Sequence, residues 1–257
     1  AIGMGINMDL DYIYFSNLKK FDGKKLRRLN LSEVGQIAGR AGRYLNDGSF
    51  GVTGQCKEIN AEEVDLIENH KFEEIQSLFW RNSNLNFNNS SALLKSLEEK
   101  PNKGWLRKIH ECEDEKALKY FLRDKDFQNI EFNEKKLSLL WECCQIPDFV
   151  KKTYGNHYEV IENVFKFLSD KKGEIPDDFM HVQLMKLDKL EGNVDSLSNR
   201  IANVRTWSYV SNKNNWVENQ NYWIEKTKHL EDRLSDRLHE ELTKTFIDKR
   251  ASVLARG

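Results

Sequence analysis

The spacing of hydrophobic positions divides the chain into two parts that meet near residue 70. Residues 11–15 form a short apolar run that predicts a buried strand, and residues 48–54 predict another strand. Between them, residues 31–44 predict a helix with Ser32 as its N-cap. Strand, helix and strand in this order indicate the end of an α/β sheet, which needs more strands to be complete.

Beyond that point the apolar positions follow helical spacing almost throughout. Residues 72–79 begin this pattern, and an Asn-rich loop is expected over residues 82–89. Residues 194–208 carry a seam with steps of three and four, and residues 216–242 carry a second seam with steps of seven and then four. The turn between the two seams is expected over residues 211–215.

These patterns predict an α+β chain that is mostly α. Residues 1–70 would be the truncated end of an α/β lobe. Residues 71–257 would be a helical region that contains a long antiparallel helical hairpin. No apolar stretch approaches 18 residues, so no transmembrane helix is expected.

The composition of the chain excludes some classes of function. Net charge is −1, which excludes a globally basic nucleic-acid binder but permits local basic patches. The 6 Trp, 8 Tyr and 14 Phe require a core. None of the four cysteines forms a Cys-x-x-Cys pair, so we expect reduced thiols and no metal site.

The most informative segment is residues 36–43, which read Gln-Ile-Ala-Gly-Arg-Ala-Gly-Arg. On a helix at about 100° per residue, Gln36, Arg40 and Arg43 would fall within an arc of about 60°. Two guanidiniums and an amide on one face suit phosphate oxygens, because the planar arginine fork stays charged and binds bidentately. The alternative is a helix whose arginines form surface salt bridges.

A second Gly-rich segment lies upstream. Residues 1–8 precede the first strand and can present backbone N–H groups to phosphate. Together, the two segments and the intervening strand resemble motifs V and VI of superfamily 2 helicases. The likeness extends to the RNA helicase family of the mitochondrial degradosome, in its bacterial branch, over residues 20–23, 36–44, 140–149, 200–209 and 234–240.

The resemblance implies a two-lobed motor of RecA-like domains with a helical region over the RNA path. Such a motor uses ATP and Mg²⁺ to move along and unwind RNA, typically from 3′ to 5′. Gln36, Arg40 and Arg43 would reach ATP held on the other lobe, with Arg43 as the arginine finger. Relatives often carry Arg where this chain has Ile37. The motif that couples nucleotide to nucleic acid would include Gly3, Gly5 and Asn7.

The ATP-binding motifs themselves are missing from these 257 residues. There is neither a Gly-x-x-x-x-Gly-Lys-[Ser/Thr] loop nor an Asp-Glu-x-His or Asp-Glu-x-Asp motif. ATP and Mg²⁺ would therefore be bound mainly by the missing N-terminal lobe, and the fragment alone is expected to be inactive. The implied partners are RNA and an exoribonuclease or other degradosome component, in the bacterial cytoplasm or in a eukaryotic mitochondrion.

A basic hairpin is the other candidate RNA contact. Asp22-Gly23 predicts its tight turn. The alternative is a solvated hairpin kept soluble by lysine. Its basic residues are Lys19, Lys20, Lys24, Lys25, Arg27 and Arg28.

Two rival functions remain. The chain could be a non-catalytic RNA-binding or docking module, or part of a DNA helicase of the same superfamily. The aromatic residues near residues 207–223 recur at seam spacing, which favours core packing over base stacking.

Overall fold

The computed structural model describes residues 10–22, 25–42, 46–124, 127, 130–150 and 154–254, the side chains of 154–155 and 246–254 excepted. The chain forms two compact units, residues 1–77 and residues 78–257. Each unit is described separately.

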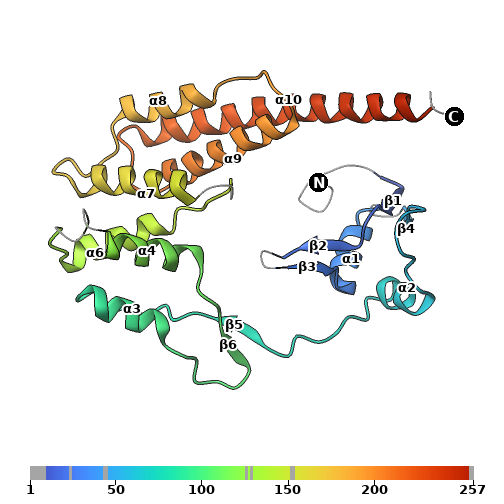
Figure 1. Ribbon diagram of the computed structural model, residues 1–257, viewed down its shortest axis with the longest axis horizontal. Coiled ribbons are helices and arrows are strands. Elements are labelled where there is room, and N and C mark those ends of the chain that lie inside the picture. Colours follow the sequence, from blue (N-terminus) through green and yellow to red (C-terminus); the bar gives the residue numbers. More distant parts are fainter. Residues whose placement is uncertain are drawn as a thin grey trace. The chain divides into compact units, whose positions relative to one another are not determined.

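The first unit contains two small sheets (Figure 1). Strands β1 (Tyr12–Phe15) and β4 (Ser49–Val52) pair in parallel, and β2 (Lys19–Phe21) and β3 (Leu26–Arg28) form an antiparallel hairpin. The strands predicted on either side of the helix and the hairpin at Asp22 are confirmed. The first strand is half-buried, because its side chains alternate between core and solvent.

Helix α1 (Leu31–Ala38) lies between the parallel strands in sequence. The prediction of Ser32 as the N-cap is wrong, because Asn30 is the N-cap. The backbone N–H of Asn30 donates a hydrogen bond of 2.9 Å to the Glu33 carboxylate. A glutamate three residues after the cap stabilises the first turn in this way. Helix α2 (Ala61–Glu68) begins with the corresponding pair, Asn60 and Glu63.

Residues 72–79 are not helical, so that prediction is wrong. Residues 71–77 are irregular, and β5 (Leu78–Trp80) pairs in parallel with β6 (Leu106–Lys108). Helical spacing failed here because the apolar side chains do not share one buried face: Ile75 is 80% exposed. The predicted Asn-rich loop is confirmed, and Asn82 donates hydrogen bonds to the backbone oxygens of Asn84 and Ser96.

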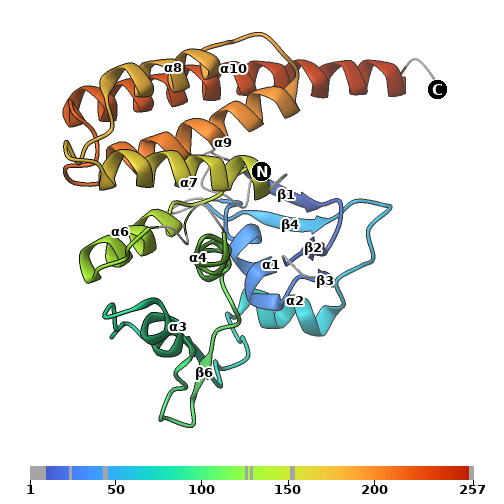
Figure 2. The same cartoon turned by 60° about the vertical axis from the view of Figure 1, so that its left-hand side comes forward.

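Helices make up most of the second unit (Figure 2). They lie along the chain after β5, with β6 between the first two. Their bounds are α3 (Ser90–Glu98), α4 (Glu113–Arg123), α6 (Glu134–Cys144), α7 (Tyr154–Ser169), α8 (Asp177–Leu187), α9 (Val194–Ser211) and α10 (Gln220–Leu254).

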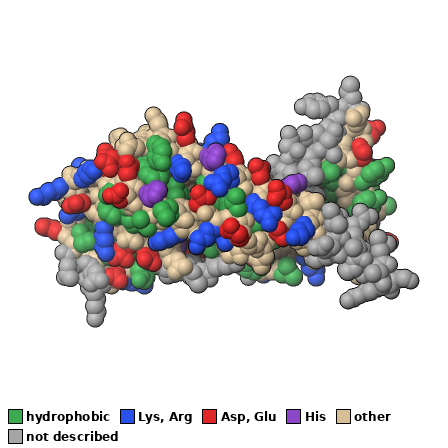
Figure 3. Space-filling view, turned by 90° about the horizontal axis from the view of Figure 1, so that it is seen from above, with side chains coloured by type: hydrophobic (Ala, Val, Ile, Leu, Met, Phe, Trp, Pro, Cys, Tyr) green, Lys and Arg blue, Asp and Glu red, His purple; other side chains and the backbone are tan. Residues whose placement is uncertain are grey.

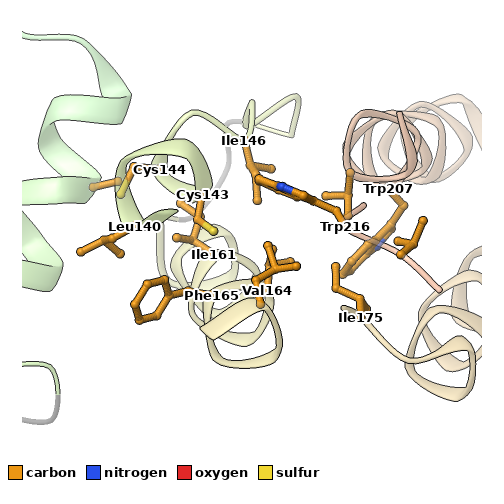
Figure 4. Close-up of a cluster of buried hydrophobic side chains, with 14 of the residues drawn as sticks. Leu140, Cys143, Cys144, Ile146, Ile161, Val164, Phe165, Ile175, Trp207 and Trp216 are labelled. Atoms are coloured by element: carbon orange, nitrogen blue, oxygen red, sulfur yellow. The ribbon is translucent and has the colours of Figure 1, made fainter. Parts of the chain in front are cut away.

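Figure 4 shows the part of the second unit's core that α6, α7, α9 and the segments after them contribute. Leu140, Ile161 and Phe165 are fully buried there, and Trp207 and Trp216 pack into the same cluster. Core packing was the favoured interpretation of these tryptophans, and it is confirmed. Cys143 and Cys144 are buried in this cluster as free thiols.

Helices α9 and α10 pack against each other. The seam on α10 holds as far as Leu234, which is fully buried, and weakens after Leu238. Leu242, the last residue of the predicted seam, is 41% exposed.

Charges of both signs are interspersed on the face over α8 and α10 (Figure 3). None of the described helices is both long enough and apolar enough to cross a bilayer.

Candidate functional site

The segment over residues 36–43 leaves the helix halfway through. Helix α1 ends at Ala38, and Gly39 is its C-cap. The next N–H groups, those of Arg40 and Ala41, donate to carbonyls only three residues back, at 3.2 and 2.9 Å. The predicted helical arc shared by Gln36, Arg40 and Arg43 is therefore wrong.

Gly42 explains why the helix cannot continue. Its φ is +71°, which is the left-handed region that favours glycine. Its N–H donates to the Leu10 carbonyl at 2.7 Å, just before β1. A Cβ on Gly42 would lie 2.5 Å from the backbone nitrogen of Gly48. The backbone at Gly42 therefore lies very close to the residue that precedes β4. The turn after α1 is thereby tied to the ends of both parallel strands.

The buried side of α1 is formed by Val34 and Ala38, which pack with Ile13 of β1. Gln36 lies on the exposed side, and Arg40, just beyond the helix, is half-buried. The structure thus supports exposure of the amide, while the roles of both side chains stay predictions. Five more of the proposed site residues, Gly3, Gly5, Asn7, Lys24 and Arg43, lie outside the described residues.

Gly35, which lies within α1, has a packing role that the sequence did not reveal. A Cβ on Gly35 would lie 2.7 Å from Cζ of Phe72. The absence of a side chain therefore lets the ring of Phe72 pack onto the helix. The contact joins residues far apart in the chain, so no local pattern indicated it.

Much of the positive charge of the β2–β3 hairpin is neutralised within the first unit. Glu33 accepts two hydrogen bonds of 2.8 Å from Arg27 and pairs with Lys20 at 2.5 Å. These contacts, above all the hydrogen bond from Arg27, hold the pKa of the Glu33 carboxyl far below its usual range. Glu33 therefore joins the hairpin to the first turn of α1.

A second carboxylate neutralises the end of the hairpin. Glu63 of α2 accepts bonds of 2.7 and 2.9 Å from the two terminal nitrogens of Arg28. This bidentate pair raises the pKa of Arg28 and lowers that of Glu63. In the part of the hairpin that the structure describes, only Lys19 and Lys25 lack an ion pair. The alternative of a structural, solvated hairpin gains support.

A group of possible metal ligands lies at the start of α4. Ligand atoms of Cys112, Asp114 and Glu115 lie within 4.8 Å of one another. Arg81 donates to both oxygens of Asp114, at 2.9 and 2.8 Å, and its guanidinium lies over the Trp141 ring. Because the guanidinium of Arg81 already pairs with Asp114 in this group, we assign the group to an ion-pair network.

Comparison with known proteins gives short but clear matches. The chain is 46% identical over 67 residues to "ATP-dependent RNA helicase SUV3, mitochondrial" of Oryza sativa subsp. japonica, covering 26% of this chain and 11% of that protein. It is 57% identical over 51 residues to "DExH-box ATP-dependent RNA helicase DExH16, mitochondrial" of Arabidopsis thaliana, covering 20% of the chain and 9% of the relative. The match to SUV3 of Candida albicans is 52% over 44 residues, 17% of the chain and 6% of the relative.

The matched part therefore spans about a tenth or less of these relatives, which are plant and fungal proteins. No protein-family model matches the chain. No solved structure matches it either. Assignment to a bacterial branch stays a prediction. Over these short stretches, the chain is therefore similar to DExH-type ATP-dependent RNA helicases.

Proposed function

We propose that the chain is the C-terminal part of a protein that couples ATP hydrolysis to movement along RNA and to its unwinding. The observation that carries this proposal is the identity of 46–57% to RNA helicases over 44–67 residues. The motif over residues 36–43 supplies the chemistry, since its arginines suit the γ-phosphate of a bound nucleotide.

The first unit would be the end of a RecA-like lobe. Its parallel pair, β1 and β4, with α1 between them in sequence, is the unit from which such α/β lobes are built. In the second unit, α9 and α10 would form the long antiparallel hairpin beside the RNA path. The packing of α9 on α10, with Arg205 bound to Glu231 at 2.7 Å, supports a hairpin.

The turn after α1 would present the arginines to ATP on the opposite lobe. Gln36 lies on the exposed side of α1, and the positive φ of Gly42 shapes the turn that follows α1. In this proposal Arg43 stabilises the charge of the transferring phosphoryl group, and Arg40 and Gln36 orient it. Gly3, Gly5 and Asn7 would couple the nucleotide to RNA. ATP and Mg²⁺ would be held mainly by the other lobe.

The proposed partner is RNA, together with an exoribonuclease or another degradosome component. The relatives' names place them in mitochondria, so we propose a mitochondrial location in a eukaryote and a cytoplasmic one in a bacterium.

The test uses the full-length protein. RNA-stimulated ATP hydrolysis would be compared for wild type, Arg43→Ala and the control Arg233→Ala. Arg233 is a surface arginine of α10 that pairs with Asp188, the C-cap of α8. We expect Arg43→Ala to lower turnover by roughly 10³-fold with RNA and ATP binding retained, as for other arginine fingers. Arg233→Ala should match wild type. Equal turnover in all three would refute the role of Arg43 and favour a non-catalytic RNA-binding module.

Two further comparisons complete the test. The 257-residue chain alone should show no ATPase activity, and detectable RNA-stimulated activity would contradict the proposal. Single-stranded RNA should activate the full-length ATPase more than single-stranded DNA does. The reverse order would indicate a DNA helicase.

A further inference from the structure

The small sheet of β5 and β6 has an exposed aromatic and basic face. Phe79 lies opposite Arg107 in the parallel register, so the two side chains share one face, and Phe79 is 74% exposed. Trp105, which immediately precedes β6, is 51% exposed, and the Lys103 ammonium lies 5.3 Å from the centre of its ring.

The charge around these strands differs from that of the whole chain. Residues 78–90 and 100–110 contain five Lys and Arg and no Asp or Glu, although the chain as a whole has a net charge of −1. Arg81 is paired with Asp114. In the described structure no ion pair involves the other four, which are Lys100, Lys103, Arg107 and Lys108.

The strands are held in place without these exposed side chains. Arg81, which follows β5, binds Asp114 at the start of α4, and Asn82 donates to the Ser96 carbonyl of α3 at 3.0 Å. Leu93 and Leu97 of α3 are buried in the core of the second unit. The face is therefore positioned by its own unit, and Phe79 and Trp105 are not needed to hold it there.

We propose that this face, defined by Phe79, Lys103, Trp105 and Arg107, binds single-stranded RNA. Bases would stack on the two aromatic rings, while phosphates would contact Lys103 and Arg107, which is the combination that single-strand binding requires. This proposal rests on the proposed function, because it places one of the RNA contacts of the helicase. It differs from the β2–β3 hairpin, where glutamates already neutralise Lys20, Arg27 and Arg28.

The aromatic part is tested on the 257-residue chain by fluorescence anisotropy with a labelled oligouridine of about 12 nucleotides, within the range of single-strand site sizes. Phe79→Ala and Trp105→Ala should each weaken binding about five- to hundred-fold, as expected for the loss of one stacked base. The matched control is Tyr222→Ala, which removes an aromatic ring of 52% exposure from α10 and should leave affinity unchanged.

The electrostatic part is tested by salt dependence. Arg107→Ala should reduce the slope of log affinity against log salt by about 0.7, the value for one lost phosphate contact on a single strand. The control is Lys171→Ala, which removes an exposed lysine from the turn after α7 and should leave the slope unchanged.

Each contrary outcome has a distinct meaning. If the chain binds RNA and all variants bind like their controls, the face is not the contact and the helicase proposal stands. If the wild-type chain does not bind the oligonucleotide, the proposed face fails, while the ATPase test on the full-length protein still decides the function. If Phe79→Ala or Trp105→Ala lowers the unfolding temperature by several degrees more than Tyr222→Ala, the rings pack against protein and the proposal is overturned.

Discussion

A Cβ atom on Gly42 would lie only 2.4 Å from the carbonyl oxygen of Asn46, so this turn after α1 accepts no other residue without rearrangement. The positive φ of Gly42 adds a second reason, since a side chain is strained in that conformation. Gly42 therefore determines where the segment that carries Arg40 lies. It has no direct role in phosphate chemistry.

We predict that Gly42→Ala destabilises the first unit by about 2 to 4 kcal/mol, from backbone strain and the clash with Asn46 together. Gly54→Ala is the control, because a Cβ there meets nothing within 4 Å, and it should change stability by less than about 0.5 kcal/mol. Hydrogen–deuterium exchange of residues 31–38 under native conditions measures both. Equal protection in the two variants would show that the turn relaxes freely.

The hairpin should depend on pH through Glu33. Its pKa is lowered in the folded state by hydrogen bonds from Arg27, and further by Lys20 and the Asn30 N–H. A depressed carboxyl pKa contributes stability above the unfolded value of about 4.3, and this contribution is lost as pH falls below it. Amide protection of the hairpin should therefore decrease below about pH 4.

Glu33→Gln separates charge from capping. Glutamine at this position can still accept the bond from the Asn30 N–H, so α1 should remain capped. The variant should show weak hairpin protection already at pH 7, with little change on acidification. Glu68→Gln, an exposed carboxylate at the end of α2, is the control and should keep the wild-type profile. A strong acid dependence in Glu33→Gln would assign the effect to another group.

Local signals accounted for much of the fold. A short apolar run predicted β1, residues 48–54 predicted β4, the Asp22 turn predicted the β2–β3 hairpin, and seam spacing predicted the burial of Trp216 and Leu234. Each of these depends on neighbours within a few residues, so the sequence contains the whole signal.

The failures depend on partners distant in sequence. β5 forms because β6 pairs with it across α3, which no pattern within residues 72–79 could show. The prediction at the candidate site was wrong for a similar reason. We expected the helix to continue through residues 36–43, but it ends at Gly39, and Gly42 lies in a turn beside the ends of β1 and β4. Neutralisation of the basic hairpin needed Glu63 of α2, equally remote.

The end of the α9–α10 packing can be located by two substitutions of the same kind on α10. Leu234 is fully buried, so Leu234→Ala should cost about 2 to 5 kcal/mol. Leu242 is 41% exposed, so Leu242→Ala should cost less than about 1 kcal/mol. Urea denaturation followed by tryptophan fluorescence reports on this unit, which contains all 6 Trp. Similar losses would mean that packing continues to Leu242.

Glu115 offers a test of a buried charge in α4. The residue is only 3% exposed, and its Oε1 has no hydrogen-bond partner among the residues that the structure describes. Burial raises the pKa of its carboxyl, although Arg81, 3.9 Å away, acts in the opposite direction. The folded state therefore holds a proton more tightly than the unfolded state does. The contribution of Glu115 to the stability of the second unit is therefore most favourable below the unfolded pKa of about 4.3. This contribution becomes less favourable as pH rises through the folded value.

Glu115→Gln should remove that fall, because the amide stays neutral at every pH. We predict that the variant is more stable than wild type at pH 7 and that the difference disappears below about pH 4. Glu113→Gln is the control, since Glu113 is exposed on the same turn of the helix and should change stability little. Urea denaturation at several pH values measures all three proteins. A Glu115→Gln variant less stable than wild type at pH 7 would show instead that attraction to Arg81 outweighs the cost of burying the carboxylate.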